Sequence, residues 1–217
     1  NEKAGVVALH KIFDRIQREN IPFQGNFYAI TGNMEALKKN VRYNAQDLNR
    51  IWIENNFEKI RANGQGVLEH KELIEIYDLI KKIVTEEKGP FIFLDLHTTS
   101  SDSKPFITIS DSLNNRKFSK HFPVPIILGI EEYLEGPFLS YINKFGHISL
   151  GFEGGQHEDL KSVNYCEAFI YIALTASKSI KKSSVPNMAS YEDVFLDGGK
   201  KKDFVEISYR YPIHSND

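Results

Sequence analysis

One short apolar run after a proline constrains the fold of this chain more than any other feature of its sequence. Gly89-Pro90 is followed by Phe91-Ile92-Phe93-Leu94, in which polar and apolar residues do not alternate. Such a run is typical of a strand that is buried on both faces in a mostly parallel sheet. The run ends at Asp95-Leu96-His97, and open α/β sheets bind ligands at the carboxyl ends of their strands. The sequence therefore predicts an α/β fold with a site beside His97.

Other segments supply the helices and further strands of the same α/β architecture. Apolar residues recur at helical spacing after Ala4, after Leu68 and after residue 159. This spacing predicts three amphipathic helices, the last of them over 159–182. The predicted strands are short, apolar and bounded by turn residues, and they lie at 27–31, 91–94, 106–109, 124–128 and 148–152.

A polar stretch near the C-terminus indicates a domain boundary. Lys181-Lys182-Ser183-Ser184 is followed by Pro186-Asn187, a composition typical of a linker. We therefore expect one α/β domain over residues 1–185. The tail from Phe204 to Ile213 alternates like a strand, but too few residues remain there to bury a core. We expect residues 186–217 to be the linker and the start of a truncated, β-rich second domain.

The composition excludes several classes of protein. Of the 217 residues, 41% are hydrophobic and 26% are charged, which are ordinary globular values and exclude collagen-like and disordered chains. The 27 Lys and Arg residues are scattered and are balanced by 29 Asp and Glu residues, so no basic stripe for nucleic acid exists. The longest apolar run, from Ala168 to Leu174, is far shorter than the roughly 18 residues that a membrane-spanning helix needs. We expect neither nucleic acid nor a membrane as a partner.

Cys166 is the only cysteine, so no disulfide can form within the chain. A chain without disulfides suits a reducing compartment, and we expect a cytoplasmic protein. Cys166 also lies among apolar residues of the last predicted helix, where a thiol is buried and inert rather than nucleophilic. The sequence leaves the oligomeric state open, including a homo-oligomer.

Polar side chains that suit a binding site follow or separate the predicted strands. His97 ends one predicted strand, and Glu153 ends another and precedes two glycines. Arg42 and the segment Asp47-Leu48-Asn49-Arg50 supply guanidinium and amide groups suited to a carboxylate or an oxyanion. Each of these residues, taken alone, also fits a structural role, as a capping histidine, a solvated turn glutamate or a surface ion pair. The residues alone therefore leave both interpretations open.

Five separated blocks carry a resemblance to a known family. The chain opens with Asn1-Glu2-Lys3-Ala4-Gly5 and later contains Asp95-Leu96-His97. The other blocks are Gly32-Asn33, Arg42 with Asp47-Leu48-Asn49-Arg50, and Glu153-Gly154-Gly155. In this order they resemble the succinylglutamate desuccinylase and aspartoacylase family of zinc-dependent amidohydrolases, which are relatives of the zinc carboxypeptidases. The resemblance spans residues 1 to about 182.

The resemblance implies a fold and a metal site. The fold would be a zinc-carboxypeptidase-like mixed sheet flanked by helices. One zinc ion per chain would be bound by Glu2 and His97, with a third protein ligand, a histidine, expected upstream of Asn1. A catalytic zinc with three protein ligands leaves one position for water and lowers the pKa of that water to about 7.

The resemblance also implies roles in catalysis and substrate binding. Arg42 would polarise the scissile carbonyl, Asn49 and Arg50 would hold a substrate carboxylate, and Glu153 would act first as general base and then as general acid. The implied substrate is an N-acyl amino acid or a related small molecule with an amide, or an ester, bond. In aspartoacylase itself, an arginine about ten residues before the catalytic Glu holds the side-chain carboxylate of N-acetylaspartate. The same count from Glu153 reaches Asn143.

Two other functions stay open at this point. One is a non-catalytic binding module on the same fold, and the other is a peptide carboxypeptidase, which differs mainly in the size of its pocket. A serine hydrolase is not indicated, because Thr98-Thr99-Ser100 is not part of a Gly-x-Ser-x-Gly motif. His10 is interpreted as a packing or surface residue and His157 as a loop residue, rather than as metal ligands.

Overall fold

The centre of the computed structural model is a five-stranded mixed sheet, and the structure describes residues 2–63, 66–195 and 203–209. The strands stand in the order β1 (Ile92–Thr99), β4 (Ile148–Gln156), β2 (Phe106–Ile109), β3 (Ile126–Leu128) and β5 (Phe204–Glu206). The pairs β1·β4, β2·β3 and β3·β5 are parallel, whereas β2 runs antiparallel to β4. The predicted α/β fold with a mixed sheet is confirmed.

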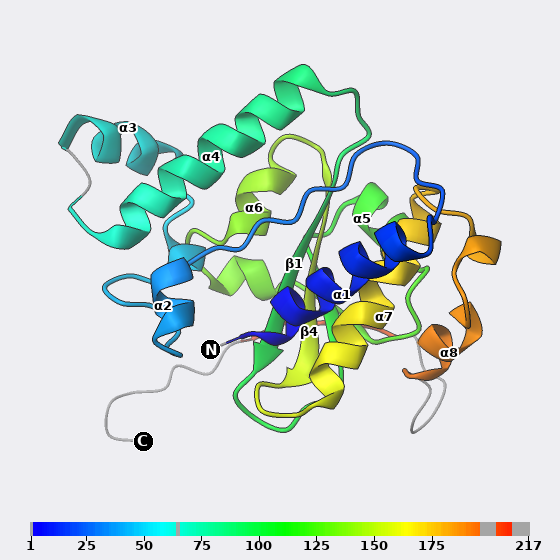
Figure 1. The fold of residues 1–217 in the computed structure, drawn as a ribbon. Helices are drawn as coiled ribbons and strands as arrows, with labels where there is room; N and C mark the ends of the chain where they lie inside the picture. Colours follow the sequence, from blue (N-terminus) through cyan, green and yellow to red (C-terminus); the bar gives the residue numbers. More distant parts are fainter. Residues whose placement is uncertain (1, 64–65, 196–202, 210–217) are drawn as a thin grey trace.

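Helices cover both faces of this sheet (Figure 1). The α-helices are α1 (Ala4–Arg18), α2 (Met34–Lys38), α3 (Glu54–Asn63), α4 (Leu68–Glu86), α5 (Leu113–Ser119), α6 (Phe138–Asn143), α7 (Lys161–Ala176) and α8 (Met188–Asp193). The 3₁₀ helices are η1 (Leu48–Arg50), η2 (Ile130–Tyr133) and η3 (Lys182–Ser184). The three predicted amphipathic helices correspond to α1, α4 and α7. Helix α7 is shorter than the predicted 159–182, because Lys178 adopts a left-handed φ of 65° just beyond its end.

Two apolar cores lie on opposite faces of the sheet. Alternate residues of β4, such as Leu150 and Phe152, are fully buried against α1 and α7, and Phe152 stacks on Phe169 with ring centroids 4.2 Å apart. The second core joins α3, α4 and α6 around Trp52, and Phe93 of β1 packs against it. The intervening residues of β4 thus face the second side of the sheet, where the polar side chains of the site lie.

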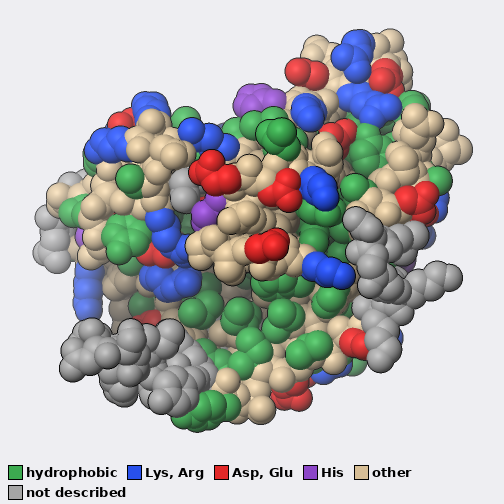
Figure 2. Space-filling view, turned by 90° about the horizontal axis from the view of Figure 1, so that it is seen from below, with side chains coloured by type: hydrophobic (Ala, Val, Ile, Leu, Met, Phe, Trp, Pro, Cys, Tyr) green, Lys and Arg blue, Asp and Glu red, His purple; other side chains and the backbone are tan. Residues whose placement is uncertain are grey.

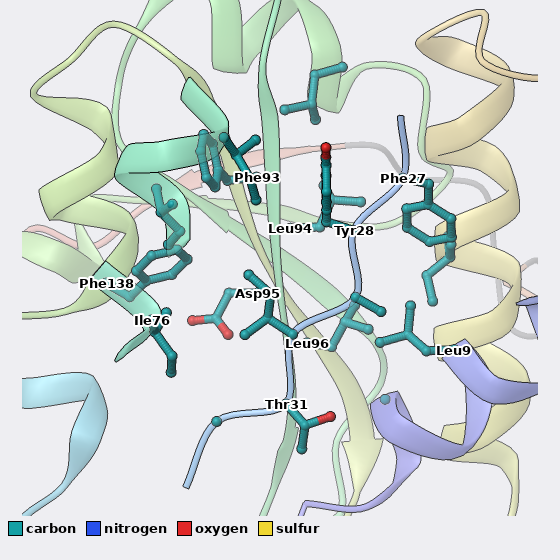
Figure 3. Close-up of a pocket in the computed structure, with 18 of the residues that line it drawn as sticks. Leu9, Phe27, Tyr28, Thr31, Ile76, Phe93, Leu94, Asp95, Leu96 and Phe138 are labelled. Atoms are coloured by element: carbon teal, nitrogen blue, oxygen red, sulfur yellow. The ribbon is translucent and has the colours of Figure 1, made fainter. Parts of the chain in front are cut away.

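The strand predicted over 27–31 does not form, and this prediction is wrong. These residues run past the outer edge of β1, and a cavity of about 900 Å³ is lined by both segments. Figure 3 shows Phe27 and Tyr28 of this segment and Leu94 and Leu96 of β1 among the side chains that line the cavity. An apolar segment without a neighbouring backbone cannot form a ladder of hydrogen bonds. For the same reason β1, predicted to be buried on both faces, is only half-buried along most of its length.

Hydrophobic side chains also gather in a hollow on the face of the molecule shown in Figure 2, among interspersed acidic and basic side chains.

No helix in the described part of the chain is long and apolar enough to cross a membrane.

The C-terminal part packs on the same sheet and helices as far as the structure describes it. Met188 of α8 is buried in the core that α7 forms with β4, and β5 pairs with β3. The predicted strand from Phe204 to Ile213 contains β5, while residues 210–217 lie outside the described residues. A second domain over 186–217 stays a prediction.

Candidate active site

The segment before α1 and the end of β1 bring Glu2 and His97 together. Oε2 of Glu2 lies 2.9 Å from Nδ1 of His97 and also accepts the backbone N–H of Thr98 at 3.1 Å. Gly5 permits this approach, because a Cβ atom at that position would lie only 2.8 Å from Cβ of Leu96. The two residues expected to bind a metal therefore converge on one point.

Asp95 contacts the other nitrogen of the same imidazole. Its Oδ2 lies 2.9 Å from Nε2 of His97, because residues two apart on a strand share a face. Burial lowers the pKa of His97, but the carboxylates of Asp95 and Glu2 outweigh burial and hold this pKa well above its usual value. Burial raises the pKa of Glu2, but the hydrogen bonds to His97 and the Thr98 backbone, together with the positive charges of His97 and Arg42, outweigh burial and lower this pKa. Sequence reasoning missed Asp95 as a site residue, although its spacing to His97 is visible in the sequence.

Glu153 lies directly across the sheet from His97. The parallel pairing of β1 with β4 places the Cα atoms of these two residues opposite each other. Oε2 of Glu153 is buried and has no hydrogen-bond partner among the described residues. Burial raises the pKa of Glu153 to about 7, and Glu2 and Asp95 add to this shift while His97 and Arg42 oppose it. A carboxyl group with a pKa near neutrality can both take and return a proton.

Arg42 places a guanidinium beside these carboxylates. Its Nε donates to Oδ2 of Asp47 at 2.9 Å, and its Nη1 lies 3.8 Å from Oε1 of Glu2. Burial lowers the pKa of Arg42, but the carboxylates of Asp47, Glu2 and Glu153 outweigh burial and raise it. Arg42 is therefore a permanent cation at the site.

Helix η1 fixes Asn49 and Arg50. Oδ1 of Asp47 accepts the backbone N–H of Asn49 at 2.9 Å and so caps η1. The Asn49 amide donates to Oδ2 of Asp95 at 3.3 Å, and its Oδ1 accepts the backbone N–H of Phe138 at 2.7 Å. Nη1 of Arg50 donates to the Asn49 carbonyl at 2.6 Å. Asn49 thus joins η1 to β1 and α6, an arrangement that the sequence alone did not predict.

All six residues singled out from the sequence line one small pocket. Its volume is about 120 Å³, and it opens between the carboxyl ends of β1 and β4 and helices η1, η2 and α6. The polar residues that line it are Glu2, Arg42, Asn49, Arg50, Asp95, His97, Thr98, Thr108, Ser110, Ser140, Ser149 and Glu153. Most of the same charged residues also border the larger cavity beside β1.

The side-chain oxygen and nitrogen atoms that meet at this point are of the kinds that bind zinc. Glu2 and His97 present a carboxylate oxygen and an imidazole nitrogen to each other, and zinc binds both kinds of atom. Asp95 orients the far side of the imidazole, as carboxylates do for metal-binding histidines. Across the described residues, no group of three or more His, Cys, Asp or Glu side chains is arranged to hold a metal ion. The residues present therefore fit two of the three protein ligands of a catalytic zinc.

The remaining sequence candidates lie outside the pocket. His10 is exposed on α1, and Nδ1 of His157 lies 2.6 Å from the hydroxyl of Thr98. Cys166 is fully buried on α7, where burial raises the pKa of its thiol to about 12. A thiol with that pKa stays protonated at neutral pH, so Cys166 is inert as interpreted from the sequence.

Comparison with known proteins gives a family match. Residues 1–162 match the model of the succinylglutamate desuccinylase/aspartoacylase catalytic domain. A comparison with curated protein sequences finds no match.

Solved structures share the fold at low sequence identity. A succinylglutamate desuccinylase from Chromobacterium violaceum is 14% identical with a TM-score of 0.67, over 83% of this chain and 59% of that one. A succinylglutamate desuccinylase/aspartoacylase from Rhodobacter sphaeroides is 18% identical with a TM-score of 0.63, over 83% and 53%. A product-bound ectoine utilization protein from Ruegeria pomeroyi is 16% identical with a TM-score of 0.64, over 94% and 58%. This chain thus spans between half and three fifths of the length of these structures.

Proposed function

The chain belongs to the succinylglutamate desuccinylase/aspartoacylase family, and on that premise we propose that it is a zinc-dependent hydrolase of small N-acyl compounds. The bond cleaved would be an amide, or an ester, in an N-acyl amino acid or a related molecule. The single buried cysteine suits a reducing compartment, so we place this activity in the cytoplasm.

Glu2 and His97 would hold the zinc ion, together with a third protein ligand that the family resemblance places before Asn1. A bound zinc ion would polarise its water and supply a nucleophile at neutral pH. Asp95 would keep the His97 ring in one orientation by accepting its Nε2 proton. Nδ1 of His97 would bind the zinc ion without a proton, since a metal-binding imidazole is neutral.

Glu153 and Arg42 would carry out the proton transfer and the charge stabilisation. Glu153 would take one proton from the attacking water as the new C–O bond forms. It would give that proton to the leaving nitrogen as the C–N bond breaks, which yields a carboxylic acid and an amine. Arg42 would donate to the carbonyl oxygen as negative charge develops there, an effect worth about 10²–10³ in rate for one such donor.

Asn49 and Arg50 would orient the substrate through a carboxylate. Arg50 lines the pocket, and a guanidinium binds a carboxylate with two parallel hydrogen bonds. The Asn49 amide nitrogen donates to Asp95 and lies 3.1 Å from Nε2 of His97, so Asn49 would meet the substrate carboxylate beside this pair.

One observation supports this proposal most strongly. The Glu2 and His97 pair lies opposite a buried Glu153 oxygen without a hydrogen-bond partner, so ligand donors and a free base share one pocket. The test is a zinc measurement and a hydrolysis assay on the full-length protein. We expect about one zinc per chain and hydrolysis of N-acyl amino acids. Zinc-free, inactive protein would instead favour a binding module, and hydrolysis confined to peptides would favour a carboxypeptidase.

A further inference from the structure

The inner end of the pocket holds a buried hydroxyl without a hydrogen-bond partner. Ser149 lies four residues before Glu153 on β4, so both side chains point to the same face of the sheet. Ser149 is 1% exposed, it lines the pocket, and its Oγ has no hydrogen-bond partner in the described part of the chain. By contrast, the hydroxyl of Ser162, which is also fully buried, donates to the Gln156 carbonyl at 2.6 Å. A buried hydroxyl that makes no hydrogen bond lowers the stability of the folded state, unless a bound ligand supplies the hydrogen-bond partner.

Gly151 separates Glu153 from Ser149 on the wall of the pocket. It lies between these two residues on the same face of β4 and lines the pocket. A Cβ atom at position 151 would lie 2.3 Å from Oγ1 of Thr108 and 3.2 Å from Cδ1 of Leu139. The side chains of Thr108 and Leu139 therefore pack directly against Gly151, and no larger residue fits between Glu153 and Ser149 without moving them.

A second buried polar residue holds Ser149 in place. Oδ1 of Asn115, which is fully buried, accepts the Ser149 backbone N–H at 2.9 Å. The Asn115 amide donates to the Ser110 carbonyl at 3.1 Å and to Oδ1 of Asn143 at 3.3 Å. The inner wall of the pocket is therefore fixed by hydrogen bonds that do not use the Ser149 hydroxyl.

The surroundings of Ser149 favour an uncharged group. Ile109, Ile130, Leu134 and Leu139 line this pocket, and the only Lys or Arg side chains that line it among the described residues are those of Arg42 and Arg50. Both arginines already contact groups near the mouth, Asp47 and the Asn49 carbonyl. A carboxylate beside Ser149 would thus lack a free counter-charge, which is costly in a partly apolar site.

We propose that Ser149 is a specificity-determining residue that hydrogen-bonds a short, neutral, polar side chain of the substrate's amino acid. This inference rests on the proposed function. A serine hydroxyl both donates and accepts, so it suits a hydroxyl group on the substrate. Ser149 lines the smaller pocket of about 120 Å³ and not the larger cavity beside β1, which favours a short side chain.

The test compares isosteric substrates that differ by one hydroxyl group. The pairs are N-acylserine with N-acyl-2-aminobutyrate, and N-acylhomoserine with N-acylnorvaline, assayed with zinc-loaded full-length protein. For at least one pair, we expect wild-type kcat/KM to favour the hydroxyl member about tenfold, and Ser149→Ala to reduce this ratio below about twofold. Calorimetric titration with the free amino acid products should show the same change in the ratio of Kd values.

Two further variants keep the test decisive. Ser149→Cys preserves the shape of the side chain with a much weaker hydrogen-bonding group, and it should lose the preference as Ser149→Ala does. Ser162→Ala removes an equally buried hydroxyl outside the pocket and should leave the ratio unchanged. Two outcomes would refute the role of Ser149 and leave the proposed function intact. In the first, the wild type hydrolyses these substrates but every variant keeps the wild-type ratio. In the second, the wild type hydrolyses them but prefers neither member of any pair. If the wild type hydrolyses no N-acyl amino acid at all, the proposed function fails, and this inference fails with it.

Discussion

Nδ1 of His97 lies 2.9 Å from Oε2 of Glu2, although 95 positions separate the two residues in the chain. The same Glu2 oxygen accepts the Thr98 backbone N–H, so the carboxylate is aligned by β1 before any ligand binds. Two ligand atoms held at one point lose little conformational freedom on binding a metal, which favours affinity. This pair is the basis of the first two predictions.

We predict that His97→Ala and Glu2→Ala each weaken zinc binding by the full-length protein at least about 100-fold. Each substitution removes one of the few protein ligands of the zinc ion. Its effect on zinc affinity should exceed the 10-fold to 100-fold loss that is typical when a residue hydrogen-bonded to a ligand is replaced. Competition with a chromogenic chelator measures the affinity. His10→Ala, which removes an exposed histidine from α1, is the matched control and should bind zinc like the wild type. If His97→Ala binds zinc as tightly as the wild type, His97 is not a zinc ligand.

We also predict that the chain of residues 1–217 alone binds zinc poorly. Only Glu2 and His97 converge as donors within its described residues, whereas a catalytic site uses three. Competition with a chromogenic chelator, carried out on residues 1–217 and on the full-length protein, compares their zinc affinities. A third ligand such as His10 or His157, found in a zinc-bound structure of residues 1–217, would contradict the assignment of the missing histidine.

The third prediction concerns the base. Glu153→Gln should lower kcat by about 10²–10⁴ while zinc content stays near that of the wild type, because the amide keeps the shape but takes no proton. Metal analysis and steady-state kinetics of the same preparation separate the two effects. Glu158→Gln, at an exposed position five residues later, is the control and should keep its activity. A Glu153 variant with most of its activity would assign the base role elsewhere.

Elements whose pattern is local were predictable from the sequence. The periodicities after Ala4 and Leu68 predicted α1 and α4, and the predicted strand at 106–109 coincides with β2. The segment 27–31 has an equally good strand composition, yet it lies across a cavity from β1 and has no neighbouring strand. Composition cannot report whether a neighbour is present, so such a prediction depends on tertiary structure.

The sequence likewise allowed the prediction of some residues of the site but not of others. His97 and Glu153 were predictable because both end strands, and parallel strands of one sheet bring their carboxyl ends together. Asn49 could not be placed, because its contacts to Asp95 and Phe138 join segments 46 and 89 residues apart. Ser149 gave no signal either, since an isolated serine in an apolar strand becomes informative only when its hydroxyl is found buried without a hydrogen-bond partner.

The fourth prediction concerns stability and its dependence on pH. Glu69 is fully buried on α4, and its Oε1 accepts the backbone N–H groups of Asn44 and Ala45, close to Arg42 and Asp47 in the chain. Glu69→Ala would leave these groups without an acceptor, so the free energy of unfolding should fall by about 1–3 kcal/mol. Urea unfolding at pH 7 measures this change. Glu75→Gln, at an exposed ion pair on the same helix, should change it by less than about 0.5 kcal/mol.

The pH dependence of the Glu69 contribution follows from its pKa. Burial raises the pKa of Glu69, but the backbone N–H groups of Asn44 and Ala45 outweigh burial and lower it below the ordinary 4.5. A carboxylate with a lowered pKa stabilises the folded state fully above pH 4.5, and this contribution is lost as the pH falls through the folded pKa. The difference in unfolding free energy between wild type and Glu69→Gln should therefore shrink from pH 6 toward pH 3. A difference that grows on acidification would refute the assignment.

The last prediction concerns the charge of the substrate. Asn143, ten positions before Glu153, accepts a hydrogen bond from Asn115, and Lys144 beside it is exposed. Neither residue lines the pocket, so among the described residues no Lys or Arg besides Arg42 and Arg50 lines it to bind a second carboxylate. Losing a bidentate contact to a charged group costs about 2–3 kcal/mol, so kcat/KM for N-acetylaspartate should be about 30-fold to 150-fold below that of neutral analogues. Asn143→Arg should not restore it, because this position points to Asn115 rather than into the pocket. A panel of N-acyl amino acids with zinc-loaded full-length protein decides, and a clear preference for N-acetylaspartate would show that a cation reaches the pocket from elsewhere.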